Sequence, residues 1–174
     1  MRTKVGTERR GSAVMLRPDD SDHDNSAEWA EIQAAMVIDC SPETVFSFAC
    51  DPFNDGRWLT DVGNTQQLTP GPVGLRSRYR QFPFFLGVRV EVEWEVIEFT
   101  PNWHIKGRSV AGAFQFVRGY DCEPVGSATR ITKIGKLHLP PVSAFVTKGA
   151  ADVLLSKSAE RALKRLKILL ERGG

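Results

Sequence analysis

Apolar and polar residues alternate along several stretches of the chain, which predicts β-strands with one buried face. The first stretch is 32–38. Ser41-Pro42-Glu43 follows it with the features of a helix start, namely a capping serine, an early proline and an acid near the positive end of the helix dipole. Asp51-Pro52 predicts a second short helical turn that ends near Trp58. The chain therefore begins with a strand and two short helices.

Arginines and glutamates alternate with apolar residues in the middle of the chain. A hairpin turning at Phe85-Leu86 opposes them on one face: Arg80 with Glu91, Arg78 with Glu93, and Arg76 with Glu95. Opposed charges of opposite sign stabilise a sheet by roughly 0.2–1 kcal/mol per pair. A slip by one residue would turn every charge toward the core. This register places Tyr79, Val92 and Trp94 on the inner face.

A further turn at Thr100-Pro101 adds a third strand to this hairpin. In that register Gly107 faces Trp94 on the inner side, where a small residue leaves room for the indole. His104 falls on the outer face, which favours a surface histidine over a general base. Trp103 falls inside, close to a strand end.

A last hairpin, around residues 124–127, places Arg118 and Lys133 opposite each other on the inner face. Like charges in opposition destabilise a sheet, and a buried unpaired charge costs more. Three arrangements avoid this cost. A bulge turns one side chain outward, or both reach the rim with their apolar stems buried. In the third, both line a pocket and meet an acidic group, either on the protein, with Glu98 as a candidate, or on a ligand.

From Pro141 onward the apolar residues recur at the three- and four-residue steps of an amphipathic helix. The predicted apolar stripe consists of Val142, Phe145, Val146, Ala150, Val153, Leu154, Ala159, Ala162, Leu163, Leu166 and Leu169. We expect this stripe to pack against the inner face of the sheet. Because a strongly curved sheet and a single helix cannot close everywhere, a pocket should remain between them.

Several of these segments, taken in order, resemble a known superfamily. They are Ser41-Pro42-Glu43-x-Val45-Phe46, Asp51-Pro52, Arg57-Trp58, Gly71-Pro72-Val73-Gly74, 123–132 and Ala162-Leu163-x-x-Leu166. Together they are similar to the helix-grip superfamily SRPBCC (START or pollen-allergen-like), in its polyketide cyclase/dehydrase-like branch. The resemblance covers roughly 30–172. It implies an α+β helix-grip fold, in which a curved antiparallel sheet of about six or seven strands, with two short helices after its first strand, wraps around a long C-terminal helix. It implies a ligand cavity and no single chemistry.

Composition adds few constraints. With 174 residues, 41% hydrophobic and 25% charged, the chain suits one globular domain at 29–172. The tail at 1–28, which is basic and polar at 3–10 and acidic at 18–26, is expected to be disordered. The net charge of +2 gives no reason to expect a nucleic-acid partner, and no apolar run approaches the ~20 residues of a membrane span. Three cysteines, an odd number, predict a reducing compartment, and we expect the cytoplasm.

The candidate ligand contacts are mostly aromatic. They are Trp58, at the mouth of the pocket, and Tyr79, Val92, Trp94, Trp103, Phe116, Arg118 and Tyr120. Large rings fill space or stack on flat apolar ligands. We therefore expect the protein to bind a small hydrophobic molecule, such as a lipid, a polyketide or an aromatic compound. The sequence offers no metal-ligand spacing, no phosphate-binding loop and no recognisable acid–base pair. We expect no metal and no cofactor, and the catalytic residues, if any, are unknown.

Two other functions stay open. A cyclase or dehydratase without metal or nucleotide cofactor would use the same cavity, whereas a protein-interaction module would have a filled core. A cavity of several hundred Å³ separates these possibilities. The apolar hairpin tip at 82–86 is expected to cover the cavity mouth, with a membrane-surface contact or a dimer contact as alternatives. We expect a monomer or homodimer without stable membrane insertion.

Overall fold

The computed structural model describes residues 29–85, 87–138 and 148–172. The elements follow the chain in this order: β1 (Trp29–Ile38), α1 (Pro42–Ala49), the 3-10 turn η2 (Pro52–Asn54), α2 (Asp55–Trp58), β2 (Thr65–Gln67), β3 (Arg78–Gln81), β4 (Phe84–Phe85), β5 (Val88–Arg89), β6 (Val92–Thr100), β7 (His104–Gly112), β8 (Phe116–Val125), β9 (Ala128–His138) and α3 (Lys148–Arg172).

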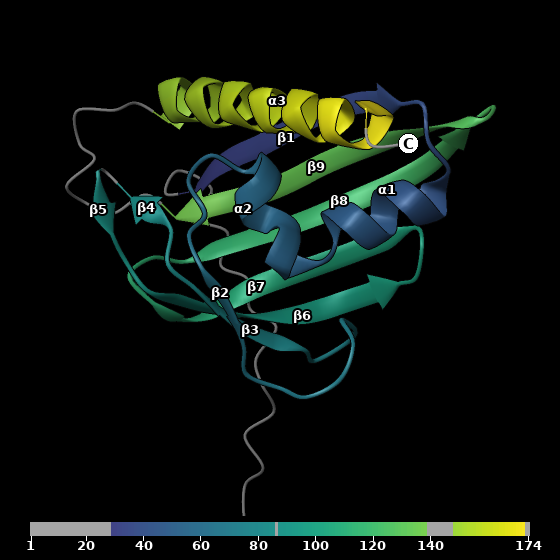
Figure 1. Ribbon diagram of the computed structural model, residues 1–174. Coiled ribbons are helices and arrows are strands. Elements are labelled where there is room, and N and C mark those ends of the chain that lie inside the picture. The colour runs from purple at the N-terminus through teal and green to yellow at the C-terminus, as the bar shows by residue number, and fades with distance from the viewer. Residues whose placement is uncertain (1–28, 86, 139–147, 173–174) are drawn as a thin grey trace, which may run out of the picture.

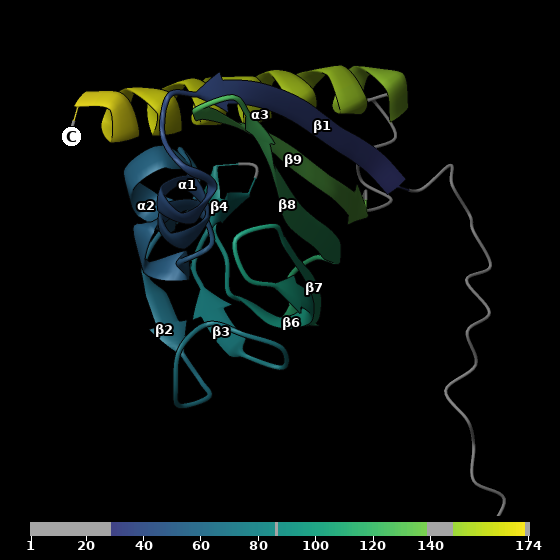
Figure 2. The same cartoon turned by 90° about the vertical axis from the view of Figure 1, so that its right-hand side faces the viewer.

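Seven strands form one curved antiparallel sheet in the order β1-β9-β8-β7-β6-β3-β2, and β4 pairs separately with β5. The long helix α3 lies across one end of the sheet, and α1 and α2 lie on its concave side (Figure 1). Figure 2 shows the sheet curling from β1 to β3 around these two short helices. The helix-grip arrangement expected from the sequence is confirmed.

The two short helices begin where the sequence predicts. Ser41 Oγ accepts a hydrogen bond from the N–H of Thr44 at 3.4 Å, and Asp51 Oδ1 caps the following turn with a bond of 3.0 Å. The helical turn α2 then ends at Trp58. Its first and last residues, Asp55 and Trp58, are both 0% exposed, so this short turn supplies two side chains to the interior.

The helix α3 runs beside β1, which is the edge strand of the sheet (Figure 2). Side chains of α3 bind the outer edge of β1, at the position that another strand would otherwise occupy. The backbone N–H of Glu31 donates to Asp152 at 2.7 Å, and that of Asp39 donates to Glu171 at 2.8 Å. These bonds occupy backbone groups that an uncovered edge would offer to another chain.

The apolar stripe of α3 matches the prediction only in its second half. The buried residues are Ala151, Ala159, Ala162, Leu163 and Leu166. Ala150, Val153 and Leu154 are exposed, so this part of the predicted stripe is wrong. The reason is that Asp152 turns toward the β1 edge, which directs its neighbours Val153 and Leu154 away from the sheet. Residues Val142, Phe145 and Val146 lie outside the described segments.

The hairpin of β3 and β6 is paired two residues away from the predicted register. Arg80 lies opposite Glu93, and Arg78 lies opposite Glu95. The tip closes between the two short strands β4 and β5, with Gly87 at a φ of 81°. Glycine adopts this conformation without steric cost, and it therefore moves the turn one residue beyond the predicted position.

The faces of these strands are nevertheless as predicted, because a shift of two residues leaves every side chain on its original face. Tyr79, Val92, Trp94 and Val96 are at most 2% exposed. Gly107 pairs with Val96 through a register shift in β6 and β7, yet it still lies against Trp94. A Cβ atom at Gly107 would come within 2.7 Å of the indole.

The turn between β6 and β7 separates two residues that the sequence placed near a strand end. His104 lies on the outer face as predicted, where its ring nitrogens contact the carboxylates of Asp121 and Glu98. Trp103 is 49% exposed, so its predicted inward position is wrong. Because Thr100 pairs directly with His104, Trp103 belongs to the turn and not to the strand.

Candidate functional site

Arg118 and Lys133 both point toward the concave side of the sheet. The hairpin of β8 and β9 turns at Gly126, which has a φ of 64°, so Tyr120 and not Arg118 lies opposite Lys133. The predicted direct opposition of the two cations is therefore wrong, although their predicted inward direction is right. The register removes the like-charge pair without a bulge at either residue.

Arg118 of β8 binds a carboxylate of the short helix α2. Its Nη1 donates to Asp55 Oδ2 at 2.8 Å, and its Nη2 donates to Asp55 Oδ1 at 3.1 Å. Such a two-point contact matches the planar shapes of guanidinium and carboxylate. An inward cation that meets an acid was one of the three predicted arrangements. The predicted acid was wrong, because Glu98 is exposed on the outer face, where it binds Lys106.

A network of buried hydrogen bonds extends from the Asp55–Arg118 pair. Gln81 Nε2 donates to Asp55 at 2.8 Å, and Gln81 Oε1 accepts from the indole N–H of Trp94 at 3.0 Å. Arg118 also donates to the hydroxyl of Tyr120 at 2.9 Å, and its guanidinium lies 4.8 Å from the centroid of the Trp94 ring. These contacts satisfy the buried polar groups and fix α2, β3, β6 and β8 relative to one another.

Burial and pairing set the charges in this network. Burial is the largest single effect and opposes the charged form of Arg118. The electrostatic and hydrogen-bond interactions with Asp55 and Tyr120 together outweigh it, so the pKa of Arg118 is raised above its usual value. Burial raises the pKa of the Tyr120 hydroxyl, and the nearby Arg118 reverses only part of that effect. At neutral pH Arg118 is therefore charged and Tyr120 keeps its proton. Neither group is suited to accept a proton from a substrate.

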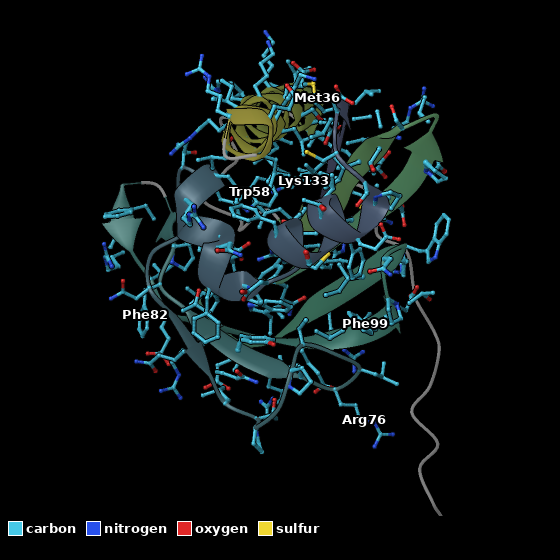
Figure 3. The ribbon with its side chains drawn as sticks, turned by 45° about the vertical axis from the view of Figure 1, so that its right-hand side comes forward. Met36, Trp58, Arg76, Phe82, Phe99 and Lys133 are labelled. Atoms are coloured by element: carbon cyan, nitrogen blue, oxygen red, sulfur yellow. The ribbon has the colours of Figure 1, made fainter. Side chains whose placement is uncertain are left out.

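Lys133 lies beside this network without an acceptor of its own. Its Nζ is 5.4 Å from the ring centroid of Trp58 and 5.6 Å from that of Tyr120. Within the described segments it makes no hydrogen bond and no ion pair. Burial, followed by the charge of Arg118, lowers the pKa of Lys133 to about 8. Figure 3 shows Lys133 next to Trp58, between α3 and the short helices.

Trp58 carries a second unused donor at the same place. Its side chain is 0% exposed, and its ring centroid lies 5.5 Å from that of Tyr120. The indole N–H has no acceptor among the described residues. The predicted position of Trp58 at the mouth of a pocket is wrong, because α2 directs the ring into the core.

A cavity of about 550 Å³ lies elsewhere, where β7 and β8 separate beyond their last pair, Arg108 with Val117. It is lined by Trp29, Arg108, Ser109, Val110, Ala111, Gly112, Phe114, Gln115, Phe116 and Val117. No residue of α3 is among them, so this is not the space between sheet and helix that the sequence predicts. Phe116 is common to this lining and to the predicted ligand contacts, and it also packs against the core.

Sequence reasoning missed two members of the network, Asp55 and Gln81. Asp55 stands in a short polar segment that is typical of solvent-exposed turns. Its partner Arg118 is 63 residues away, so spacing offered no signal. Gln81 did carry a signal, because it shares the inner face with Tyr79 and an inward amide requires partners.

The described segments contain no group of three His, Cys, Asp or Glu side chains that could hold a metal ion. None of the helices in these segments is both long enough and apolar enough to cross a membrane. All three cysteines carry free thiols. Burial raises the pKa of Cys122 to about 12, so its thiol is protonated and a poor nucleophile.

A comparison with protein families identifies one that matches most of the described fold. Residues 30–171 match the family described as polyketide cyclase/dehydrase and lipid transport. The chain belongs to this family. The match covers β1 through nearly the whole of α3, so every element that builds the cyclase/dehydrase fold is included. No curated protein matched the chain.

Solved structures show the same fold at low sequence identity. A START superfamily protein from Mycobacterium smegmatis is 18% identical, with a TM-score of 0.71 over 83% of this chain and 99% of that one. A protein from Thermus thermophilus is 22% identical, with a TM-score of 0.69 and the same coverage. The Zhui aromatase/cyclase from a Streptomyces species is 10% identical, with a TM-score of 0.65 over 83% and 94%. At these identities the likeness concerns the fold alone.

Proposed function

We propose that the protein binds a small hydrophobic molecule beside Trp58, on the concave side between the sheet and α3. The cavity of about 550 Å³ lies outside this region and the rings around Trp58 belong to the buried core, so binding requires these rings to move apart. The observation that carries this proposal is the indole N–H of Trp58, a fully buried donor without an acceptor among the described residues. Buried polar groups nearly always have a partner, and an unpaired one costs about 1–3 kcal/mol. A bound molecule that brings an oxygen atom to this position would remove the cost.

The surroundings of Trp58 suit an apolar ligand. The rings of Trp58, Tyr79, Trp94 and Tyr120 gather on the concave side, and Tyr79 stacks on Trp94 with centroids 5.0 Å apart. Aromatic faces favour flat or aliphatic molecules. Membership of a family that includes lipid transport supports the same function. The Asp55–Arg118 pair is satisfied internally, and we assign it the role of holding α2, and thus Trp58, in place.

A cyclase-type enzyme that uses the same space is the second candidate. It is favoured by Lys133, because a pKa of about 8 lies close to the working pH of a proton-transfer group. The rings would then fold the substrate and Lys133 would move a proton. In this function Tyr120 would orient the substrate, since burial keeps its hydroxyl protonated.

The tip of the β4–β5 hairpin is the proposed cover of this space. Phe84 and Val88 are 50% and 63% exposed, and the guanidinium of Arg89 lies 4.8 Å from the centroid of the Phe84 ring. The N–H of Phe84 donates to the carbonyl of Asp61 at 2.8 Å, which ties the tip to the segment after α2. We propose a cytoplasmic location as well, because all three cysteines are free thiols.

Native mass spectrometry of the purified protein, with organic extraction of what it retains, tests the binding function. We expect a bound apolar molecule, or saturable binding of a fluorescent hydrophobic probe by the empty protein. Trp58→Phe keeps a ring and removes the donor, so it should weaken retention several-fold. Trp103→Phe changes an exposed indole and serves as the matched control. A protein that is empty and also ignores the probe would refute the proposal.

A further inference from the structure

Two neighbouring side chains on the concave side offer donors that no described residue accepts. They are the ammonium of Lys133 and the indole N–H of Trp58, and the Lys133 Nζ lies 5.4 Å from the centre of the Trp58 ring (Figure 3). On the basis of the proposed binding function, we propose that the ligand carries a carboxylate. This carboxylate pairs with Lys133 and accepts a hydrogen bond from Trp58.

The charges on the concave side support an anionic group. Asp55 neutralises Arg118 through two hydrogen bonds, which leaves Lys133 as a surplus cation. The groups that act on Lys133 are Arg118, Asp55, the exposed Asp61 and the opposing Tyr120. Asp55 is engaged by Arg118, Asp61 forms no ion pair with Lys133, and Tyr120 is neutral. Lys133 is half-buried, and a cation partly withdrawn from water is stabilised by a counter-ion. The ligand is the remaining source.

Other oxygen groups fit this place less well. A ketone or hydroxyl oxygen would accept from Trp58, but it would leave the charge of Lys133 unbalanced. A carboxylate has two acceptor oxygens, one for each donor, and a single negative charge to match the single surplus cation. The rings of Trp58 and Tyr120 flank the ammonium, so the remainder of the molecule is apolar.

Proton uptake gives this site a distinctive signature. The pKa of Lys133 is lowered to about 8 because the half-buried ammonium is partly shielded from water and lies near Arg118. A bound carboxylate favours the charged form and raises that pKa. Binding of an acid at pH 8.5 should therefore take up protons from the buffer, whereas binding of a neutral molecule should not.

Decanoic acid and decanol test the proposal by titration calorimetry at pH 7. The acid is expected to bind at least about tenfold more tightly than the alcohol, since hydrogen bonds to charged groups are the stronger ones. Lys133→Met should remove this preference and leave the affinity for decanol within about twofold. Lys136→Met, on the outer face of the same strand, is the matched control and should change neither affinity.

Two further measurements separate binding chemistry from a damaged fold. Lys133→Arg keeps the charge and should keep a preference for the acid. Titrations at pH 8.5 in two buffers of different ionisation enthalpy should show proton uptake with decanoic acid for the natural protein and none for Lys133→Met. A variant that had only lost structure would bind decanol poorly as well.

The possible failures are distinguishable. Equal affinities for acid and alcohol in the natural protein, or an acid preference that survives in Lys133→Met, would overturn the carboxylate site and leave the binding function standing. A natural protein that binds neither molecule and retains nothing apolar would overturn both.

Discussion

Replacing Asp55 by asparagine tests the buried network most directly. The substitution keeps the shape of the side chain and removes the charge that neutralises Arg118. It also introduces N–H donors toward Arg118 or Gln81, both of which donate to Asp55 at 2.8 Å. Removing one partner of a buried ion pair costs about 3–5 kcal/mol. Since globular proteins are stable by only about 5–15 kcal/mol, we expect a large loss.

Urea unfolding at pH 7, followed by circular dichroism, measures this loss. For a domain of this size each kcal/mol corresponds to about 2–4 °C in Tm, so thermal unfolding should shift down by roughly 6–20 °C. Asp61→Asn removes an exposed carboxylate a few residues away and should change the free energy of unfolding by less than about 0.5 kcal/mol.

The double variant Asp55→Asn with Arg118→Met completes the test. It removes the orphaned cation, so it should be more stable than Asp55→Asn alone. Two results would refute the reasoning. One is a loss below about 1 kcal/mol for Asp55→Asn, and the other is a double variant whose loss equals the sum of the two single losses.

Three other perturbations address Lys133, Gly107 and the covered edge of β1. Because the pKa of Lys133 is lowered from 10.5 to about 8, the unfolded chain binds more protons between these pH values, and the ligand-free protein gains stability as the pH rises through them. Urea unfolding of the natural protein and of Lys133→Met measures this gain. Between pH 7.5 and 10.5 the free energy of unfolding of the natural protein should rise by up to about 3 kcal/mol relative to that of the variant. A difference between the two proteins that does not change with pH would contradict the lowered pKa. Gly107→Ala places a Cβ 2.7 Å from the Trp94 ring, so it should cost about 1–3 kcal/mol in urea unfolding and alter the near-ultraviolet dichroism; unchanged stability would mean that the ring can shift. Asp152→Ala removes the acceptor of the Glu31 N–H, so hydrogen exchange at that amide should accelerate. The free energy of unfolding should fall by about 1 kcal/mol. Equal exchange rates would show that the bond does not protect the edge.

The faces of the strands could be predicted from the sequence, whereas the pairing partners could not. Alternation alone decides that Tyr79 and Trp94 point inward, and the structure confirms it. The pairing partners depend on the position of the turn. When the turn moves by one residue along the chain, each residue pairs with a partner two positions away from the expected one. Gly87 and Gly126, both at positive φ, mark where the two hairpins turn. Weighting these glycines over the neighbouring apolar residues would have corrected both registers.

The basic half of the candidate site was visible in the sequence and the acidic half was not. Side chains alternate between the two faces of a strand, and Arg118 and Lys133 stand at positions that share a face with inward apolar residues. Their inward direction therefore follows from the alternation alone. Asp55 and Trp58 come from a four-residue helix whose direction is decided by contacts with distant strands. No local pattern encodes that direction. Trp103 was misplaced for a related reason, since the length of a turn decides whether its last residue still belongs to a strand.

The attachments of β1 have a consequence for the order in which the chain folds. This strand is made first, yet its strand partner is β9 and its helix partner is α3, and the bonds of its outer edge span 121 to 132 residues. At a synthesis rate of roughly 5–20 residues per second, β1 waits several seconds with both edges free. Such long-range pairing is slow to form. The closing step therefore belongs to the C-terminus, and a chain that stops short of α3 would leave an uncovered strand edge and be prone to aggregation.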